Sequence, residues 1–97
     1  MYRMFESCKK LEFLDLNNFY TPSLLKANQI FCNCISLKWV NISNFNTSQV
    51  NDISRLFSNC YSIISIDLHN FDTKNVIYMH NLFDNCRSLT SLNLSNF

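Results

Sequence analysis

Glycine is absent from the 97 residues, and proline occurs once. Glycine-rich phosphate-binding loops and nucleophile elbows are therefore excluded, because both need glycine at fixed backbone positions. Tight turns and left-handed backbone positions must then be taken by other residues. Asparagine, which is abundant here, tolerates them better than most. We expect asparagine to occupy such positions.

Charge is also scarce. Charged residues make up 15% of the chain and hydrophobic residues 47%, with a formal net charge of +1. This balance is typical of a packed protein and not of a disordered one. It does not indicate a nucleic-acid partner, which selects strongly basic surfaces. No apolar run approaches the ~20 residues needed to cross a membrane, so we expect no direct membrane insertion in this segment, and no targeting signal is recognisable in it.

What the sequence does contain is an internal repeat. Four aligned stretches begin and end with phenylalanine, and they align without a gap: FESCKKLEFLDLNNF (5–19), FCNCISLKWVNISNF (31–45), FSNCYSIISIDLHNF (57–71) and FDNCRSLTSLNLSNF (83–97). Their starting points define a 26-residue period, and the repeat fills the chain. We therefore expect residues 1–97 to form a single repeat array of about three and three-quarter copies, as a slice of a longer array.

Each copy changes its hydrophobic period part-way along. In LKWVNIS, Val40 and Ile42 alternate with polar or outward positions, which predicts short strands near 11–17, 37–43, 63–69 and 89–95. The next stretch begins with Thr47, a favourable helix N-cap, and continues with apolar residues at roughly helical spacing. We therefore predict an α/β fold: stacked copies, each with one parallel strand and one short helix or 3-10 segment.

A cysteine column and an asparagine column recur once in each copy. We expect the cysteines to form a buried ladder and the asparagines to bond loop backbone of adjacent copies: Cys8, Cys34, Cys60, Cys86; Asn18, Asn44, Asn70, Asn96. In-register Cβ atoms lie ~4.8 Å apart, beyond the ~3.5–4.5 Å typical of disulfides, so bridges are disfavoured. Cys32 is expected near the surface. Cys32-Asn33-Cys34 lacks a second cysteine pair, so we expect no metal and no other cofactor.

These residues carry a family resemblance. The pattern F-x-x-C-x-x-L-x-x-L-x-L, followed by N-F-x-T-x-x-V-x-x-M-x-x-L, resembles the BspA-like leucine-rich repeats of surface proteins over the whole chain. The resemblance implies a right-handed leucine-rich-repeat solenoid. It also implies display at the cell surface or secretion and, for some members, adhesion to host matrix or cell-surface proteins. Cys32 is an addition that the other copies lack.

The outward face of the strands is the candidate binding surface, because solenoids bind partners most often there. Two aromatic residues would lie side by side on it, next to a ladder of acidic and amide side chains, which is a typical composition of a contact hot spot. The candidate partner-binding residues are Phe13, Trp39, Asp15, Asn41, Asp67 and His69.

No catalytic motif is present, and His69 and His80 have no partner at motif spacing. We therefore expect a non-enzymatic module that mediates protein–protein contact or adhesion. The alternative is a structural spacer that displays other domains. Because the chain begins and ends within a copy, we also expect uncapped ends that favour head-to-tail self-association.

Overall fold

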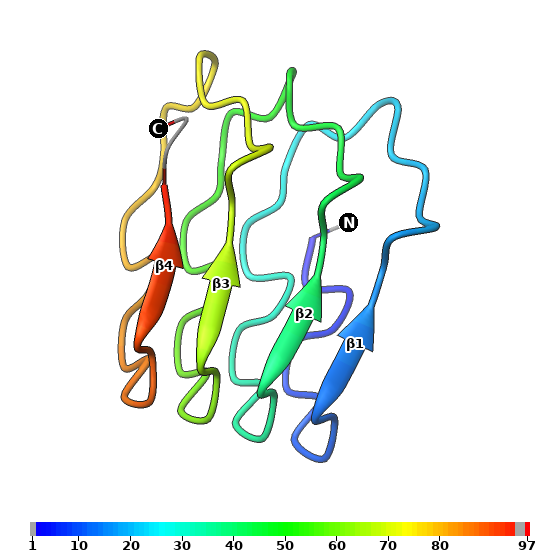
Figure 1. Ribbon diagram of the computed structural model, residues 1–97. Helices are drawn as coiled ribbons and strands as arrows, with labels where there is room; N and C mark the ends of the chain where they lie inside the picture. Colours follow the sequence, from blue (N-terminus) through cyan, green and yellow to red (C-terminus); the bar gives the residue numbers. More distant parts are fainter. Residues whose placement is uncertain (1, 95–96) are drawn as a thin grey trace.

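The computed structural model describes residues 2–94 and 97. Its four strands are three residues each: β1 (Phe13–Asp15), β2 (Trp39–Asn41), β3 (Ser65–Asp67) and β4 (Ser91–Asn93). They lie side by side and point the same way (Figure 1). β1 pairs in parallel with β2, and β3 with β4, so that each residue pairs with its equivalent in the next copy. Each strand lies inside its predicted range and is shorter than that range.

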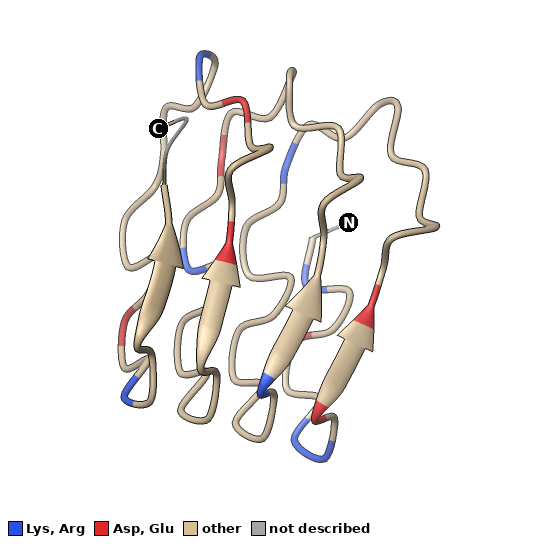
Figure 2. Ribbon diagram, in the orientation of Figure 1, with Lys and Arg blue, Asp and Glu red and all other residues tan. Residues whose placement is uncertain are grey.

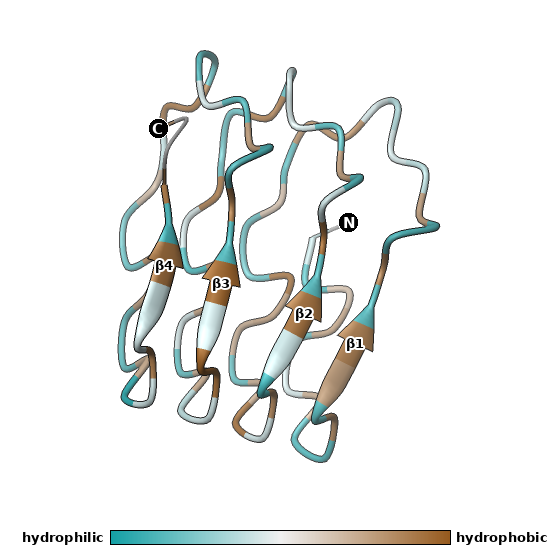
Figure 3. Cartoon of the chain, viewed as in Figure 1, coloured by the Kyte–Doolittle hydropathy of each residue, from teal (hydrophilic) through white to brown (hydrophobic). Residues whose placement is uncertain are grey.

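The chain forms four stacked layers, which we number first to fourth: residues 2–19, 20–45, 46–71 and, in the fourth, 72–94 with 97. Backbone hydrogen bonds link neighbouring layers at many points besides the strands. The N–H of Ile64 donates to the carbonyl of Lys38 at 3.2 Å, which joins the two-stranded sheets. Isolated bridges link Lys26 to Asp52 and Asp52 to Tyr78. The middle residue of every strand is hydrophobic (Figure 3), and those of β2 and β3, Val40 and Ile66, are buried.

The predicted fold class, an α/β right-handed leucine-rich-repeat solenoid with a helix or 3-10 segment in each copy, is wrong. Within residues 2–94 and 97 there is no helix, and the strands form two separate two-stranded sheets in a molecule of 29 × 22 × 18 Å. Turns occupy the segments expected to be helical. The apolar spacing that suggested a helix is real, but it comes from consecutive turns, each burying one side chain.

The destination of the backbone N–H groups explains why no helix forms. In a helix each N–H bonds to the carbonyl four residues earlier. Here the N–H groups of Ile53, Arg55 and Phe57 donate instead to carbonyls of the next layer, almost a full repeat further along, at 2.9, 3.0 and 3.1 Å. Thr47 likewise caps no helix. Its hydroxyl accepts the N–H of Asp72 in the next layer at 2.8 Å.

Two left-handed residues per layer turn the chain between these bonds. Eight residues have φ between 53° and 62°, in two columns that follow the repeat: Arg3, Gln29, Arg55, Asn81; Ser7, Asn33, Asn59, Asn85. Asparagine occupies four of the eight positions. The other four are residue types for which this conformation is less favourable. Arg55 is one of these four, so it holds a position that asparagine or glycine would occupy more favourably.

Stacked phenylalanine rings form the centre of the core. The ring centroids of Phe5, Phe31, Phe57 and Phe83 are separated by 5.8, 5.3 and 6.3 Å, with nearly parallel planes. The middle two rings are fully buried. Aliphatic columns pack around this stack, so the interior is continuous from one layer to the next.

The cysteine column runs beside the rings. Each thiol donates to the carbonyl of the phenylalanine in the preceding layer: Cys34 to Phe5 at 2.9 Å, Cys60 to Phe31 at 3.1 Å and Cys86 to Phe57 at 3.2 Å. Burial raises the pKa of Cys34 and of Cys86 to about 11, and raises that of Cys60 still further. All five cysteines are free thiols.

Two further expectations concern single positions. Cys32 is buried, with 5% of its surface exposed, so its expected place near the surface is wrong. In the asparagine column, the side-chain amide of Asn44 donates to the carbonyl of Asn17, and that of Asn70 to the carbonyl of Ser43 at 3.0 Å. Asn18 is exposed, and Asn96 lies outside the described residues.

The buried thiols predict a specific pH dependence of stability. The pKa of Cys34 is about 11 in the folded protein, against 9.0 for an ordinary thiol. Its contribution is therefore fully present below pH 9 and is lost as the pH rises to 11, because the unfolded chain ionises first. Urea unfolding between pH 8 and 11 should show a steeper loss for the wild type than for Cys34→Ala, by up to ~1.4 kcal/mol per pH unit. Parallel slopes would contradict a buried, protonated Cys34.

The left-handed column predicts opposite effects of two substitutions at one exposed position. Arg55→Asn should raise the free energy of unfolding by about 0.5–1 kcal/mol, because asparagine tolerates this conformation better. Arg55→Val should lower it by about 1–3 kcal/mol, because a β-branched residue is least compatible with it. Urea denaturation at pH 7 measures both. If the two variants had equal midpoints, the turn at Arg55 would not be left-handed.

Candidate functional site

The strand register brings the two predicted aromatic residues together. Phe13 on β1 lies directly opposite Trp39 on β2, and the two side chains are 62% and 41% exposed. Lys38, just before β2, places its Nζ 6.0 Å from the centre of the Phe13 ring and 3.5 Å from Glu12 Oε1. The result is an exposed aromatic pair with a charged rim on one side. We call Phe13 and Trp39 the aromatic pair.

The acidic and amide ladder lies at the carboxyl ends of the strands. The side-chain Oδ1 atoms of Asp15, Asn41 and Asp67 each accept the N–H of the residue two positions later, at 2.9, 3.1 and 3.0 Å. These bonds turn the chain out of each strand. Acidic residues alternate with amides from layer to layer, which keeps like charges from lying directly opposite each other. Figure 2 shows the resulting acidic ends of β1 and β3.

His69 lies beside Asp67, with its Nδ1 2.6 Å from the carboxylate Oδ1. The backbone N–H of His69, followed by its side chain, lowers the pKa of Asp67. Both side chains are largely exposed, at 46% and 63%, so the charge interaction is screened by solvent. The bonds from His69 thus fix the carboxylate of Asp67 at the strand ends, two layers away from Asp15.

The structure also shows an exposed residue that the sequence pattern did not single out. Ile64, immediately before β3, is 51% exposed and lies next to Lys38 in the adjacent layer. Strict strand alternation would place it with the buried residues. Ile64 lies just before the strand begins, where strand alternation does not apply. Its side chain is a further exposed apolar group in the third layer.

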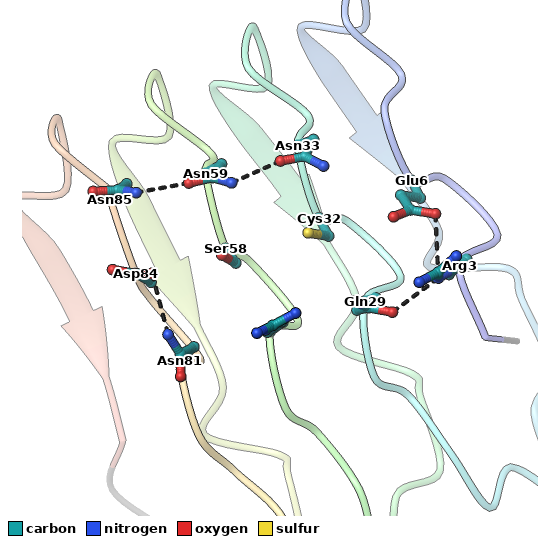
Figure 4. A pocket seen from close by; sticks show the side chains of 11 residues that line it. Arg3, Glu6, Gln29, Cys32, Asn33, Ser58, Asn59, Asn81, Asp84 and Asn85 are labelled. Atoms are coloured by element: carbon teal, nitrogen blue, oxygen red, sulfur yellow. Dashed lines mark hydrogen bonds and ion pairs between the residues drawn. The ribbon is translucent and has the colours of Figure 1, made fainter.

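A polar groove behind the strands is the second candidate site (Figure 4). It has a volume of about 450 Å³ and crosses all four layers. The two left-handed columns line it, except for Ser7. The column between them completes the lining: Glu6, Cys32, Ser58 and Asp84. The signal in the sequence was the recurrence of these polar positions once per repeat, which the helix prediction obscured.

Most polar groups in the groove already bond to each other. Asn59 donates its amide to Asn33 at 2.7 Å, and Asn85 donates to Asn59 at 2.8 Å. Arg3 contacts Gln29 at 2.9 Å and Glu6 at 3.4 Å. These contacts tie neighbouring layers together, so the groove has a structural role before any ligand is considered.

The chemistry of the groove is that of hydrogen bonding. Burial raises the pKa of Cys32, more than the nearby arginines lower it, so the thiol is a poor nucleophile at neutral pH. Among residues 2–94 and 97, no three His, Cys, Asp or Glu side chains gather in a way that could hold a metal ion. The described residues include no helix able to cross a bilayer.

Over residues 1–97 the sequence matches the family described as "Mycoplasma protein of unknown function, DUF285". The chain belongs to the DUF285 family. No curated protein and no solved structure matches it. The DUF285 description names neither leucine-rich repeats nor adhesion, so the likeness to BspA-like proteins stays a prediction for this DUF285 chain.

The contact between residues 67 and 69 predicts how Asp67 titrates. Its carboxyl should ionise below its ordinary pKa of 3.8, because the backbone N–H of His69 bonds to the charged form. In His69→Ala that N–H remains, so only part of the lowering should disappear. Side-chain NMR titration of both proteins measures this. A return of Asp67 to its ordinary pKa in His69→Ala would mean that the imidazole, and not the backbone, is responsible.

Proposed function

We propose that this DUF285 chain is a non-enzymatic module of a surface or secreted protein that binds a protein partner through the exposed strand face, in an adhesive contact. The observation that carries the proposal is the aromatic pair. Phe13 and Trp39 lie opposite each other on paired strands and remain 62% and 41% exposed. Large aromatic side chains at such positions are common centres of binding energy.

The backbone holds this pair in place at little entropic cost. β1 and β2 are hydrogen-bonded in register, and between the aromatic residues and the strand ends Val40 belongs to the buried core while Leu14 packs against that core. Each ring has only two side-chain torsions to fix when a partner binds. A preformed pair of rings therefore loses less freedom on binding than long flexible side chains would.

The charges around the pair indicate the chemistry of the partner. Asp15 and Asp67 lie on the same face at the strand ends, and both are exposed to an approaching partner. A partner that presents an aromatic or aliphatic side chain flanked by lysine or arginine would match this face. By the resemblance to BspA-like proteins, such a partner is a host matrix or cell-surface protein.

A structural spacer is the second candidate, favoured by the other half of the same face. Ser65 on β3 and Ser91 on β4 replace the aromatic residues there, so this half offers no comparable anchor. A spacer needs only stacked layers and would be indifferent to the residue at position 39.

Binding to immobilised matrix proteins, measured by surface plasmon resonance, tests the proposal. Trp39→Ala should weaken binding by about 30-fold or more, the effect of a hot-spot residue, while leaving the urea midpoint nearly unchanged. Phe13→Ala should weaken it in the same direction. Lys74→Ala is the matched control, because Lys74 is exposed and its ion pair, with Asp72 at 3.5 Å, lies away from the aromatic pair.

Two outcomes would contradict the proposal. Loss of binding in Lys74→Ala with retention in Trp39→Ala would move the partner site to another face. Unaltered binding in both aromatic variants, or no binding to any matrix or cell-surface protein, would favour the spacer.

A further inference from the structure

The polar groove behind the strands contains an arginine in an interior layer. Two arginines line the groove, and each is followed three positions later by another lining residue. In the first layer that residue is Glu6, whose Oε2 lies 3.4 Å from Arg3 Nε. In the third layer it is Ser58, which carries no charge. No ion pair among residues 2–94 and 97 involves Arg55. The positive charge of Arg55 is therefore not neutralised as that of Arg3 is.

The acidic side chains of the groove are already bonded elsewhere. Glu6 lies against Arg3 in the first layer, and Asp84 in the fourth layer accepts the side-chain amide of Asn81 at 3.2 Å. The second and third layers contribute only neutral polar side chains to the lining besides Arg55: Gln29, Cys32, Asn33, Ser58 and Asn59. An anionic group in this part of the groove would meet one guanidinium and several hydrogen-bonding groups.

The interior layers also give the groove a floor and a polar wall. Cys32 and Ser58 line the groove yet are only 5% exposed each, so they form its floor. Figure 4 shows them beside the row of asparagines that includes Asn33 and Asn59. An amide side chain offers both a donor and an acceptor, and hydroxyl groups of a ligand need both.

The backbone at Arg55 favours a different residue type. Its φ is 53°, in the left-handed region, and the same column carries asparagine at position 81. Asparagine tolerates this conformation better than arginine does. A residue that occupies a less favourable conformation than an available alternative is a candidate for a functional role.

We propose that the groove binds a sugar that carries a carboxylate, with the carboxylate on the Arg55 guanidinium and the sugar hydroxyls on Ser58 and the amides of Asn33 and Asn59. The planar guanidinium forms two parallel hydrogen bonds to a carboxylate, which a lysine cannot reproduce. The groove volume of about 450 Å³ lies within the range of small-molecule sites, roughly 300–1,000 Å³.

The lining disfavours other classes of ligand. Within the part of the chain that the structure describes, no aromatic or aliphatic side chain lines the groove, so an apolar ligand would find no matching surface. A phosphate group carries nearly two negative charges at neutral pH, and Glu6 and Asp84 on either side would repel it more than a carboxylate. Neither residue of the aromatic pair lines the groove, so this inference is independent of the proposed protein contact.

NMR titration of the full chain with glucuronate, and separately with N-acetylneuraminate, tests the proposal. The Arg55 Nε–H and the side-chain amides of Asn33 and Asn59 should shift and saturate at millimolar concentrations, as expected when one sugar ring makes few contacts. The methyl esters of both sugars lack the charge and should bind at least about 10-fold more weakly. The acid that binds more tightly identifies the type of sugar.

Arg55→Asn is the decisive variant. Asparagine suits the left-handed backbone, so this variant should unfold at a higher urea concentration than the wild type while binding the sugar at least about 10-fold more weakly. Unfolding cannot then explain the loss. Arg55→Lys keeps the charge without the planar fork and should also weaken binding. Arg87→Asn is the matched control, because Arg87 lies outside the groove, over the ring of Tyr61, and this variant should bind like the wild type.

Four outcomes would overturn the proposal. Unaltered binding by Arg55→Asn would exclude the guanidinium from the site. Equal binding of a methyl ester would mean that the carboxylate is not recognised. Equal binding of acetate or of glucose 6-sulfate would mean a general anion site without preference for an acidic sugar. No shift of groove residues with either sugar at about 50 mM would mean that the groove binds neither.

Discussion

Backbone hydrogen bonds between equivalent segments of neighbouring repeats are the constraint on which the rest of this structure depends. They take the N–H groups of Ile53, Arg55 and Phe57 out of their own segment and commit them to the next layer. Once they are committed, the segment cannot be helical, and the chain must turn between them. The left-handed residues, the stacked rings and the thiol ladder all follow from layers held at this fixed spacing. Hydrophobic burial then favours similar side chains in one column, because each layer rests on a near copy of itself.

The sequence predicted the repeat, its period and the approximate places of the strands, because each depends on residues that recur at an invariant spacing. It also placed Phe13 beside Trp39, since a one-copy shift sets the strand register. The helix that the sequence predicted between the strands is wrong. Val50, Ile53 and Leu56 occur at a spacing shared by a helix and by a run of turns that each bury one residue. Side-chain period alone does not tell where backbone N–H groups donate, and that destination decides between the two.

Of the two candidate sites, one could be predicted from the sequence and the other could not. The aromatic pair and the strand-end ladder were predictable because strand alternation assigns each residue to a face. The polar groove was not, because Arg55, Asn59 and their equivalents point into it only when the backbone is left-handed. Cys32 illustrates the difficulty at one residue. It was expected near the surface, yet only 5% of its surface is exposed.

The register of one whole repeat between neighbouring strands has a consequence for how the gene can change. Loss or gain of one whole repeat, at any boundary, leaves every column intact, because each new neighbour is chemically equivalent to the old one. Loss or gain of a single codon within a repeat shifts all later residues out of column and turns buried side chains toward solvent. Recombination between repeats can therefore lengthen or shorten the reading frame in whole-repeat steps without having to rebuild the core. Copy number is the variable that this architecture leaves open to selection.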